Sequence, residues 1–273
     1  MPYKRILTIQ DISCVGQCSM SVAHPILSAC GHEVCMLPTA VLSTHTGGFG
    51  KPVVCDLSGS MADMAEHWRN NGITFDVICI GYLGSLRAAE QAEEIMASML
   101  APNGITIVDP AMADHGKRYS GLDAAYAAVM QRLCEKADVM IPNVTEAAMM
   151  TGQPYRAGTD REYLTELLSR LGGKTVVLTG AETGPGKTGA AVRQKGEITF
   201  CTHDKLGGSF HGTGDMFAAA FAGAMASGKD AVRAAEIAGL FTARCIENTL
   251  ENPAHWYGVK FETVLCDLVD MLK

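Results

Sequence analysis

The feature of this sequence that most constrains its fold is a regular alternation of short apolar runs and longer amphipathic stretches. The apolar runs, rich in β-branched residues, predict strands over residues 5–9, 33–37, 76–80, 104–108, 138–141 and 175–179. The amphipathic stretches predict helices over residues 19–29, 61–70, 85–100, 122–134 and 160–171. Because strands that alternate with helices pair in parallel, we expect an α/β fold: a single doubly wound, mostly parallel sheet with helices on both faces.

The rest of the chain completes this plan. Two alternating runs, residues 189–193 and 197–201, flank Lys195-Gly196 and predict a hairpin, and further helices are predicted up to residue 226 and over residues 229–248 and 261–272. Residues 10–17 predict a polar turn and residues 42–50 a loop. Pro25 should kink its helix or shift the start. Without a repeat or a linker, residues 1–273 predict one domain.

A glycine-rich turn, Gly212-Thr213-Gly214, carries an acid, Asp215, and leads into an apolar run from Met216 to Ala226. Such a turn predicts the start of a helix, whose free N–H groups attract anions and above all phosphate. A carboxylate beside a bound phosphate is useful if it takes a proton from a hydroxyl nucleophile. The pattern therefore suggests phosphoryl transfer to an alcohol. The alternative is a core helix in which Asp215 only interacts with the helix dipole.

Polar residues follow the predicted parallel strands. They are Asp11 and Ser13, Gly81 and Tyr82, Asp109, Asn143 with Glu146, and Thr179. In an open α/β sheet, ligands bind outside the carboxyl ends of the strands, so we expect these residues to meet at one edge. Each residue taken alone is also explained by the polarity of loops.

The stretch Gly184-Pro-Gly-Lys-Thr188 is similar to the end of a P-loop. A P-loop needs a glycine five residues before its last one, and Ala181 occupies that position. Strand-like rather than helical sequence follows from residue 189. We therefore interpret this stretch as a loop that leads into the hairpin.

The composition of the chain indicates which partners and which cellular compartment to expect. A net charge of −7 argues against nucleic acid and anionic membranes as partners, and no apolar span of membrane-crossing length or signal peptide is recognised. Ten cysteines without a CxxC pattern fit free thiols in a reducing cytosol, so we expect a cytoplasmic protein. Cys14 and Cys18 lie in a glycine-containing turn, and their role stays open.

Seven motifs carry a resemblance to a known family, and they occur in that family's order. They are Thr8-Ile-Gln10, Ser43-Thr-His-Thr46, Gly81-Tyr82, Val108-Asp-Pro-Ala-Met112, Pro142-Asn-x-x-Glu146 with Thr151-Gly152, Val177-Leu-Thr-Gly180 and Gly212-Thr-Gly-Asp215. With them the chain resembles the ribokinase-like superfamily, and within it the pyridoxal/pyridoxamine kinase branch. Hydroxymethylpyrimidine kinase is a close relative of that branch.

The resemblance implies an ATP-dependent kinase that phosphorylates the 5′-hydroxymethyl group of a B6 vitamer. It implies that Asp215 is the base and that Gly212, Thr213 and Gly214 form an anion hole. Asp109 and Glu146 would lie at the ATP phosphates and Mg²⁺, and Asn143 and Thr179 would line the nucleotide site. His45, Thr46 and Tyr82 would hold the substrate ring. Lys205 lies in a candidate flap, residues 203–210, and is a candidate phosphate contact. Members are typically homodimers, and a K⁺ requirement stays open.

Three alternatives accompany this interpretation. Asp11 stands where a serine is common in pyridoxal kinases, which is more typical of hydroxymethylpyrimidine kinase. We expect Asp11 and Ser13 to lie at the substrate, with Asp11 favouring pyridoxamine through its ammonium group, unless Asp11 only caps the local turn. Glu146 is alternatively a cap of the short helix 145–150. A catalytically silent ligand-binding protein is the third class, against which Asp215 counts.

Overall fold

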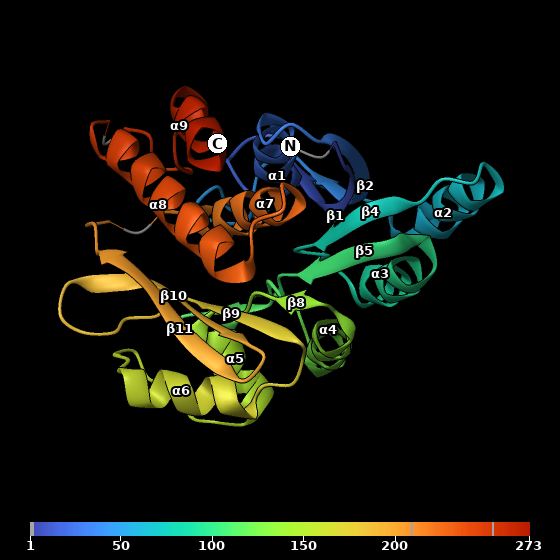
Figure 1. The fold of residues 1–273 in the computed structure, drawn as a ribbon. Helices are drawn as coiled ribbons and strands as arrows, with labels where there is room; N and C mark the ends of the chain where they lie inside the picture. Colours follow the sequence, from blue (N-terminus) through green and yellow to red (C-terminus); the bar gives the residue numbers. More distant parts are fainter. Residues whose placement is uncertain (1–2, 209, 253) are drawn as a thin grey trace.

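One mixed sheet runs through the molecule (Figure 1). The computed structural model describes residues 3–208, 210–252 and 254–273, and there the sheet has nine strands in the order β11-β10-β9-β8-β5-β4-β1-β2-β3. The strands are β1 (Arg5–Ser13), β2 (Glu33–Leu42), β3 (Val54–Asp56), β4 (Phe75–Ile80), β5 (Leu100–Val108), β8 (Val139–Met140), β9 (Thr175–Thr179), β10 (Lys187–Gln194) and β11 (Glu197–Asp204). The central strands pair in parallel, whereas β3 and the β10–β11 hairpin pair antiparallel at the two ends.

Helices cover both faces of this sheet (Figure 1). One layer consists of α1 (Met20–Ala29), α7 (Thr213–Ala226), α8 (Ala231–Leu250) and α9 (Leu265–Leu272). The other consists of α2 (Met61–Asn70), α3 (Leu86–Met99), α4 (Ala124–Lys136), α5 (Val144–Thr151) and α6 (Arg161–Arg170). Successive residues of a strand point to opposite faces, so Ile6 packs in the α7 layer while Leu7 and Ile9 pack in the α3 layer. The predicted doubly wound α/β fold is confirmed.

The strand β1 differs from its prediction. A polar turn was expected from residue 10, but β1 continues to Ser13 because its backbone still pairs with β2, with Ile12 opposite Val41 and Ser13 opposite Leu42. The register shifts between Gln10 and Ile12. This extension carries Asp11 and Ser13 on a strand rather than a loop, and it fixes their positions through sheet hydrogen bonds.

Other boundaries also moved. The helix expected to reach residue 100 ends at Met99, because Leu100 already pairs with Phe75 in the sheet. The edge strand β3 and a small hairpin, β6 (Ala113–Asp114) and β7 (Lys117–Arg118), were not predicted. Both are too short to show an alternating pattern. Pro25 does not shift the start of α1, which is helical from Met20.

Across the residues that the structure describes, no helix combines the length and the apolar character needed to cross a membrane.

Candidate active site

The helix α7 begins with an open N-terminus. Its N-cap is Gly212, which has a φ of 79° and supplies no side chain to cap the helix. A Cβ at this position would collide with the backbone oxygen of Gln17, so glycine is required both by the dihedral angle and by space. In the described part of the chain, no hydrogen bond satisfies the N–H groups of Thr213 and Gly214. Uncapped N–H groups at a helix start, together with the helix dipole, form a site for an anion.

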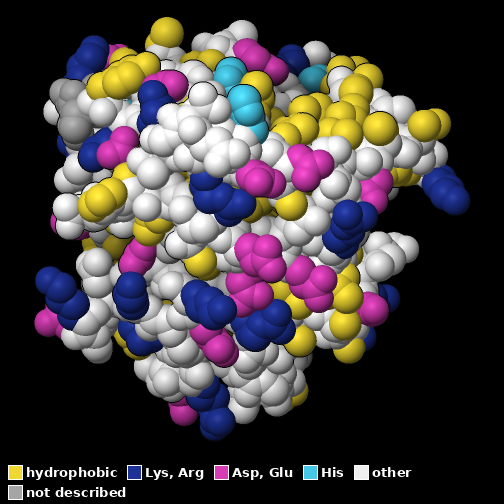
Figure 2. Space-filling model, turned by 90° about the vertical axis from the view of Figure 1, so that its right-hand side faces the viewer, with side chains coloured by type: hydrophobic (Ala, Val, Ile, Leu, Met, Phe, Trp, Pro, Cys, Tyr) yellow, Lys and Arg dark blue, Asp and Glu magenta, His cyan; other side chains and the backbone are white. Residues whose placement is uncertain are grey.

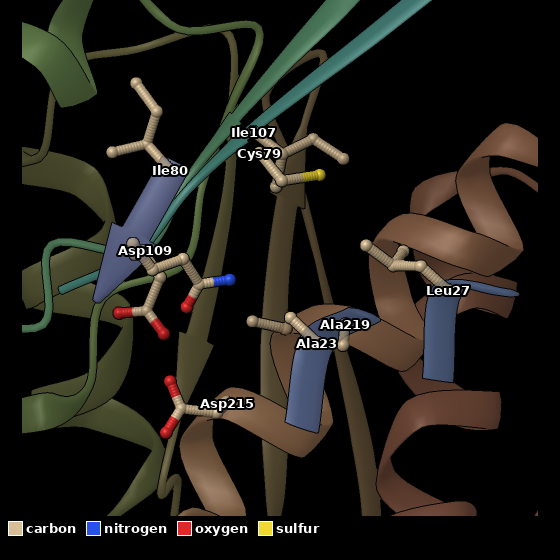
Figure 3. Close-up of a pocket in the computed structure, with 11 residues that line it drawn as sticks. Ala23, Leu27, Cys79, Ile80, Ile107, Asp109, Asp215 and Ala219 are labelled. Carbon is tan, nitrogen blue, oxygen red and sulfur yellow. The ribbon is translucent and has the colours of Figure 1, made fainter. Parts of the chain in front are cut away.

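Asp215 lies in the first turn of α7 and faces Asp109, which follows β5 (Figure 3). The two carboxylates point toward each other across a narrow cavity. The cavity is lined by Gln10, Ala23, Leu27, Cys79, Ile80, Gly81, Ile107, Asp109, Asp215, Ala218 and Ala219. Burial raises the pKa of Asp215 to about 6, with a further increase from the charge of Asp11, while the backbone N–H of Ser19 lowers it. Asp215 is therefore a weak acid whose carboxylate is ready to accept a proton near neutral pH.

Asp109 is a second, partly buried acid in this cluster. Burial raises its pKa well above the usual range, and the charges of Glu146 and Asp215 raise it further. Its Oδ1 accepts a hydrogen bond from the backbone N of Ala111 at 3.0 Å. The neighbours that act on Asp109 are thus two carboxylates and one backbone N–H group. Carboxylate oxygens are the ligands that Mg²⁺ prefers, so the facing pair Asp109 and Asp215 suits a divalent cation bound together with phosphate.

Glu146 is engaged by the backbone on both of its oxygens. It forms a capping box with Asn143: the Asn143 side chain accepts from the Glu146 N–H at 3.0 Å, and Glu146 Oε2 accepts from the Asn143 N–H at 2.9 Å. Glu146 Oε1 accepts from Met112 N at 2.8 Å and from Ala113 N at 3.3 Å. The alternative prediction, that Glu146 caps the short helix α5, is confirmed. Glu146 also fixes the segment that carries Asp109.

Asp109 and Glu146 lie close enough for the charge of Glu146 to raise the pKa of Asp109. Burial raises the pKa of Glu146 to about 7, although three backbone N–H groups lower it. Within the described ranges, however, no cluster of three or more His, Cys, Asp and Glu side chains has the arrangement of a metal site. A cation here would need oxygens from a phosphate or from water.

The ends of β1 and β4 bring Asp11, Ser13 and Tyr82 together. The Asp11 N–H donates to the Tyr82 carbonyl at 3.2 Å, and the Ser13 hydroxyl donates to Asp11 Oδ2 at 3.2 Å. Asp11 is only 2% exposed, and its Oδ1 is shielded from solvent. Burial raises the pKa of Asp11, and the hydroxyls of Ser19 and Ser13 lower it. A substrate reaches this carboxylate only if neighbouring side chains move.

His45 is buried in the loop between β2 and β3, whereas Thr46 beside it is exposed. The Nδ1 of His45 accepts from Gly47 N at 2.9 Å, and its ring lies against Gly16, where any Cβ would collide with it. Ring centroids of Phe49 and His211 lie 5.1 Å and 5.0 Å from that of His45. The predicted ring-site residues are therefore split between a buried histidine and an exposed threonine.

A C-terminal segment packs beside this loop, and this contact was not predicted. Trp256 packs on Phe49 with ring centroids 4.6 Å apart. Gln17 ties the segment to the β1–α1 turn, since its Nε2 donates to Glu262 at 2.6 Å and its Oε1 contacts His255 at 2.9 Å. These residues are more than 200 positions apart in sequence. Periodicity and local motifs carry no signal for such a contact.

The predicted nucleotide residues lie at the ends of β8 and β9. The Thr179 N–H donates to the Pro142 carbonyl at 2.9 Å, and Thr179 forms an isolated bridge with Asn143. The Asn143 side-chain NH₂ group donates to the Ala113 carbonyl at 2.8 Å. Asn143 and Thr179 are thus adjacent, and the side chain of Asn143 is used within the protein.

Lys205 follows β11 and forms an ion pair with Glu182. Both side chains retain contact with solvent, so Lys205 can exchange this partner for another anion. The candidate flap, residues 203–210, begins inside β11, and its Ser209 lies outside the described residues. The stretch 184–188 leads into the hairpin and not into a helix, as predicted, but the predicted loop is too long, because Lys187 and Thr188 already belong to β10.

All ten cysteines are free thiols. Cys14 is exposed, while Cys18 lies beside Gly212. Burial raises the pKa of Cys18, and the charges of Asp215 and Asp11 raise it further. Its thiol is therefore protonated at neutral pH, which argues against a redox or metal role for Cys18.

The chain is similar in sequence to known proteins. The family described as phosphomethylpyrimidine kinase matches residues 54–259. The pyridoxine/pyridoxal/pyridoxamine kinase of Bordetella bronchiseptica is 30% identical over 257 residues, which cover 90% of this chain and 89% of that protein.

Two solved structures are similar over nearly the whole length. The pyridoxal kinase from Lactobacillus plantarum has a TM-score of 0.90 and 33% identity, covering 99% of this chain and 98% of that one. A putative phosphomethylpyrimidine kinase from Bacteroides thetaiotaomicron, in a crystal form with pyridoxal, has a TM-score of 0.88 and 31% identity, covering 98% and 96%. The chain therefore belongs to the phosphomethylpyrimidine kinase family, and its fold is that of the ribokinase-like pyridoxal kinases.

Proposed function

We propose that this protein transfers the γ-phosphoryl group of ATP to the 5′-hydroxymethyl group of a B6 vitamer. One observation carries the proposal: Asp215 lies in the first turn of a helix whose N-terminus is uncapped, so a base and an anion site are adjacent. The similarity to kinases named for pyridoxine, pyridoxal and pyridoxamine supports a B6 vitamer as the alcohol.

The mechanism follows from the position of Asp215. With a pKa of about 6 the carboxylate is largely ionised at pH 7, and it can accept the proton of the attacking hydroxymethyl group. The N–H groups of Gly212, Thr213 and Gly214 are placed to bind oxygens of the transferred phosphoryl group. Phosphoryl transfer depends mainly on positioning and on stabilisation of charge, and a preorganised helix N-terminus supplies both.

The cavity between Asp109 and Asp215 fits Mg²⁺, because it presents carboxylate oxygens whose electrostatic neighbours are also acidic. Bound with ATP, Mg²⁺ would neutralise charge on the phosphates. Asp109 would hold the ion. Glu146 contributes by fixing the backbone of Met112 and Ala113 next to Asp109.

The remaining site residues divide between the two substrates. We place the nucleotide over the ends of β8 and β9, beside Asn143 and Thr179, with Lys205 exchanging Glu182 for a phosphate. The vitamer ring lies between Tyr82 and the loop that holds His45 and Thr46. Asp11 and Ser13 lie below it, where Asp11, once the neighbouring side chains have moved, favours an amine-bearing ring such as that of pyridoxamine.

Hydroxymethylpyrimidine kinase is the second candidate function. The matching family is described as phosphomethylpyrimidine kinase, and Asp11 stands where serine is common in pyridoxal kinases. The two activities share the same chemistry on a hydroxymethyl group. Only the ring differs between their substrates.

Consumption of ATP with pyridoxine, pyridoxal, pyridoxamine and hydroxymethylpyrimidine tests the proposal. We expect the highest kcat/KM with a B6 vitamer. Turnover of hydroxymethylpyrimidine alone would replace the proposal by the second candidate, and no turnover of any of the four would indicate a silent protein. In the same panel, Asp11→Ser should lower activity toward pyridoxamine more than toward pyridoxal.

We also propose a cytoplasmic homodimer that uses the β2–β3 edge of the sheet. Hydrophobic side chains gather on part of the surface shown in Figure 2. Around this edge the exposed hydrophobic residues are Met36, Val53 and Val54, and all three residues of β3 are exposed. Exposed apolar edges of this kind favour association. Sedimentation should give a dimer that Val53→Asp with Val54→Asp dissociates.

A further inference from the structure

Ser19 has a backbone conformation that residues with a side chain rarely adopt. Its φ is 52° and its ψ is −129°, a combination that is readily open only to glycine. Ser19 is 4% exposed, and its neighbours fix it on two sides. Its carbonyl accepts hydrogen bonds from Val22 N at 3.0 Å and Ala23 N at 2.9 Å, and its backbone pairs with Ile12 in an isolated antiparallel bridge. The conformation is therefore held by the surrounding structure.

The segment that contains Ser19 lies directly against the start of α7. A Cβ on Gly212 would collide with the Gln17 carbonyl and would lie 3.6 Å from Cys18 Sγ. The backbone N–H of Ser19 lies beside the carboxyl of Asp215 and lowers its pKa. Through its bridge to Ile12, Ser19 also lies next to Asp11, and its hydroxyl lowers the pKa of the Asp11 carboxyl, which accepts a hydrogen bond from Ser13 at 3.2 Å. One strained residue thus contacts both acids.

We propose that Ser19 is a positioning residue that holds Asp215 and Asp11 in one fixed array. The proposal rests on the proposed function only in that Asp215 is the base. Rotation about the N–Cα bond sets the direction of the N–H group relative to the side chain. The unusual φ therefore decides whether one residue can reach Asp215 with its N–H and Asp11 with its hydroxyl.

That this position is a serine and not a glycine supports a role for its side chain in addition to forming the turn. Glycine would adopt this conformation without strain, whereas serine retains the strain and adds a hydroxyl. The hydroxyl lies beside Asp11, whose Oδ2 accepts from Ser13 and whose Oδ1 has no hydrogen-bond partner in the described part of the chain. Removing the Ser19 hydroxyl would leave Ser13 as the remaining hydroxyl donor to Asp11. The position of the Asp11 carboxylate would then be less well fixed. Because the charge of Asp11 acts on Asp215, the Asp215 carboxylate would be affected as well.

Two variants of Ser19 and one control test this role. Ser19→Gly relieves the strain and removes the hydroxyl, and Ser19→Ala removes the hydroxyl alone. We expect both to lower kcat by about 10-fold to 100-fold, as a misplaced base does, with less than a 3-fold change in either KM. Ser19→Gly should unfold at the same denaturant concentration as the wild type or a higher one. Lys195→Gly is the matched control, since Lys195 also has a φ of 52° but lies in the β10–β11 turn; its kcat should not change.

A double-mutant cycle with Asp11→Asn tests the route through Asp11. In the Asp11→Asn background, Ser19→Gly should lower kcat by a smaller factor than in the wild type. The proposal is overturned if Ser19→Gly retains more than half of the wild-type kcat, or if it is less stable and loses activity only in proportion to unfolded protein. Strictly multiplicative effects in the cycle would overturn the route through Asp11.

The assay uses whichever of the B6 vitamers or hydroxymethylpyrimidine the wild type phosphorylates. Failure of the B6 assignment therefore appears in the wild type, while failure of the Ser19 role appears only in the variants. A wild type that phosphorylates none of these alcohols would overturn both.

Discussion

The N-termini of α5 and α7 carry the same kind of residue at the same position and use it differently. Each helix has an acid in the first turn, three residues after the N-cap: Glu146 in α5 and Asp215 in α7. In α5 the N-cap is Asn143, and the capping box joins it to Glu146. In α7 the N-cap is Gly212, which has no side chain to offer.

This difference decides at which helix the backbone N–H groups and the carboxylate are free to bind a ligand. In α5 the side chains of Asn143 and Glu146 each accept a hydrogen bond from the other residue's backbone N–H. Glu146 also accepts from Met112 N and Ala113 N, so its carboxylate connects two segments of the backbone. In α7 the missing cap leaves N–H groups for an anion and leaves the Asp215 carboxylate facing the cavity (Figure 3). The capping box engages the acid of α5 within the protein, whereas the uncapped start of α7 leaves its acid free for the catalytic role that we propose.

The largest expected effect concerns Asp215. We expect Asp215→Asn to lower kcat by about 10²–10⁴-fold, the usual range for a lost general base, while KM changes much less. The same change should stabilise the protein. The folded-state pKa of about 6 lies above the ordinary value of 3.8, so ionisation costs stability as the pH rises between these values. At pH 7 we expect a gain of about 1–2 kcal/mol in the free energy of unfolding, measured by urea denaturation. A variant with more than half of the wild-type kcat would contradict the role.

The next effect compares the two ends of α7. Gly212→Ala should lower kcat by about 10²–10³-fold, because its Cβ collides with the Gln17 carbonyl and displaces the N–H groups of the anion site. Gly228→Ala is the control. Gly228 has a φ of 90° at the other end of the helix, and a Cβ there meets no atom within 4 Å. Both variants are strained, so equal kcat values for the two would show that the anion site is not at Gly212.

A smaller effect is expected for the capped helix. Glu146→Gln places an NH₂ group against backbone N–H donors, and it should cost about 0.5–2 kcal/mol of stability. Because Glu146 fixes the segment next to Asp109, activity should also require a higher Mg²⁺ concentration. Asp160→Ala is the control: Asp160 caps α6 by accepting from Tyr163 N at 2.8 Å, and its loss should lower stability without changing the Mg²⁺ dependence.

The metal requirement itself has a direct check. Wild-type protein should lose its activity in excess chelator and regain it with added Mg²⁺. Full activity under chelation would remove the reason for placing an ion beside Asp109.

The smallest effect concerns pH. Since the base must be ionised, kcat/KM should fall as the pH drops below about 6, the pKa of Asp215. The charge of Asp11 raises this pKa in addition to burial, so Asp11→Asn should move the fall to a lower pH. A pH–rate profile of both proteins measures the shift. Coincident profiles would show that Asp11 does not act on Asp215 by charge.

Much of the fold was predictable because its signals are local. The β-branched runs, the helix periodicity and the glycine-rich start of α7 each depend on neighbouring residues, and the structure places α7 at Thr213–Ala226 with Asp215 in its first turn. The boundaries that were wrong depended on pairing with distant strands. Gln10 to Ser13 remain in β1 only because β2 lies beside them.

The site was predictable in part for the same reason. Parallel strands end at one edge of a sheet, so Asp11, Asp109, Asn143 and Thr179 could be expected to converge. The sequence by itself determined the order of strands and helices and the acid at the start of α7. The tertiary structure alone decided which acid is satisfied by the backbone, that Trp256 packs on Phe49 and His255 meets Gln17, and that Ser19 lies beside both Asp11 and Asp215. Hydrogen bonding and burial depend on residues that meet only after folding, and one sequence read along the chain does not contain their distances.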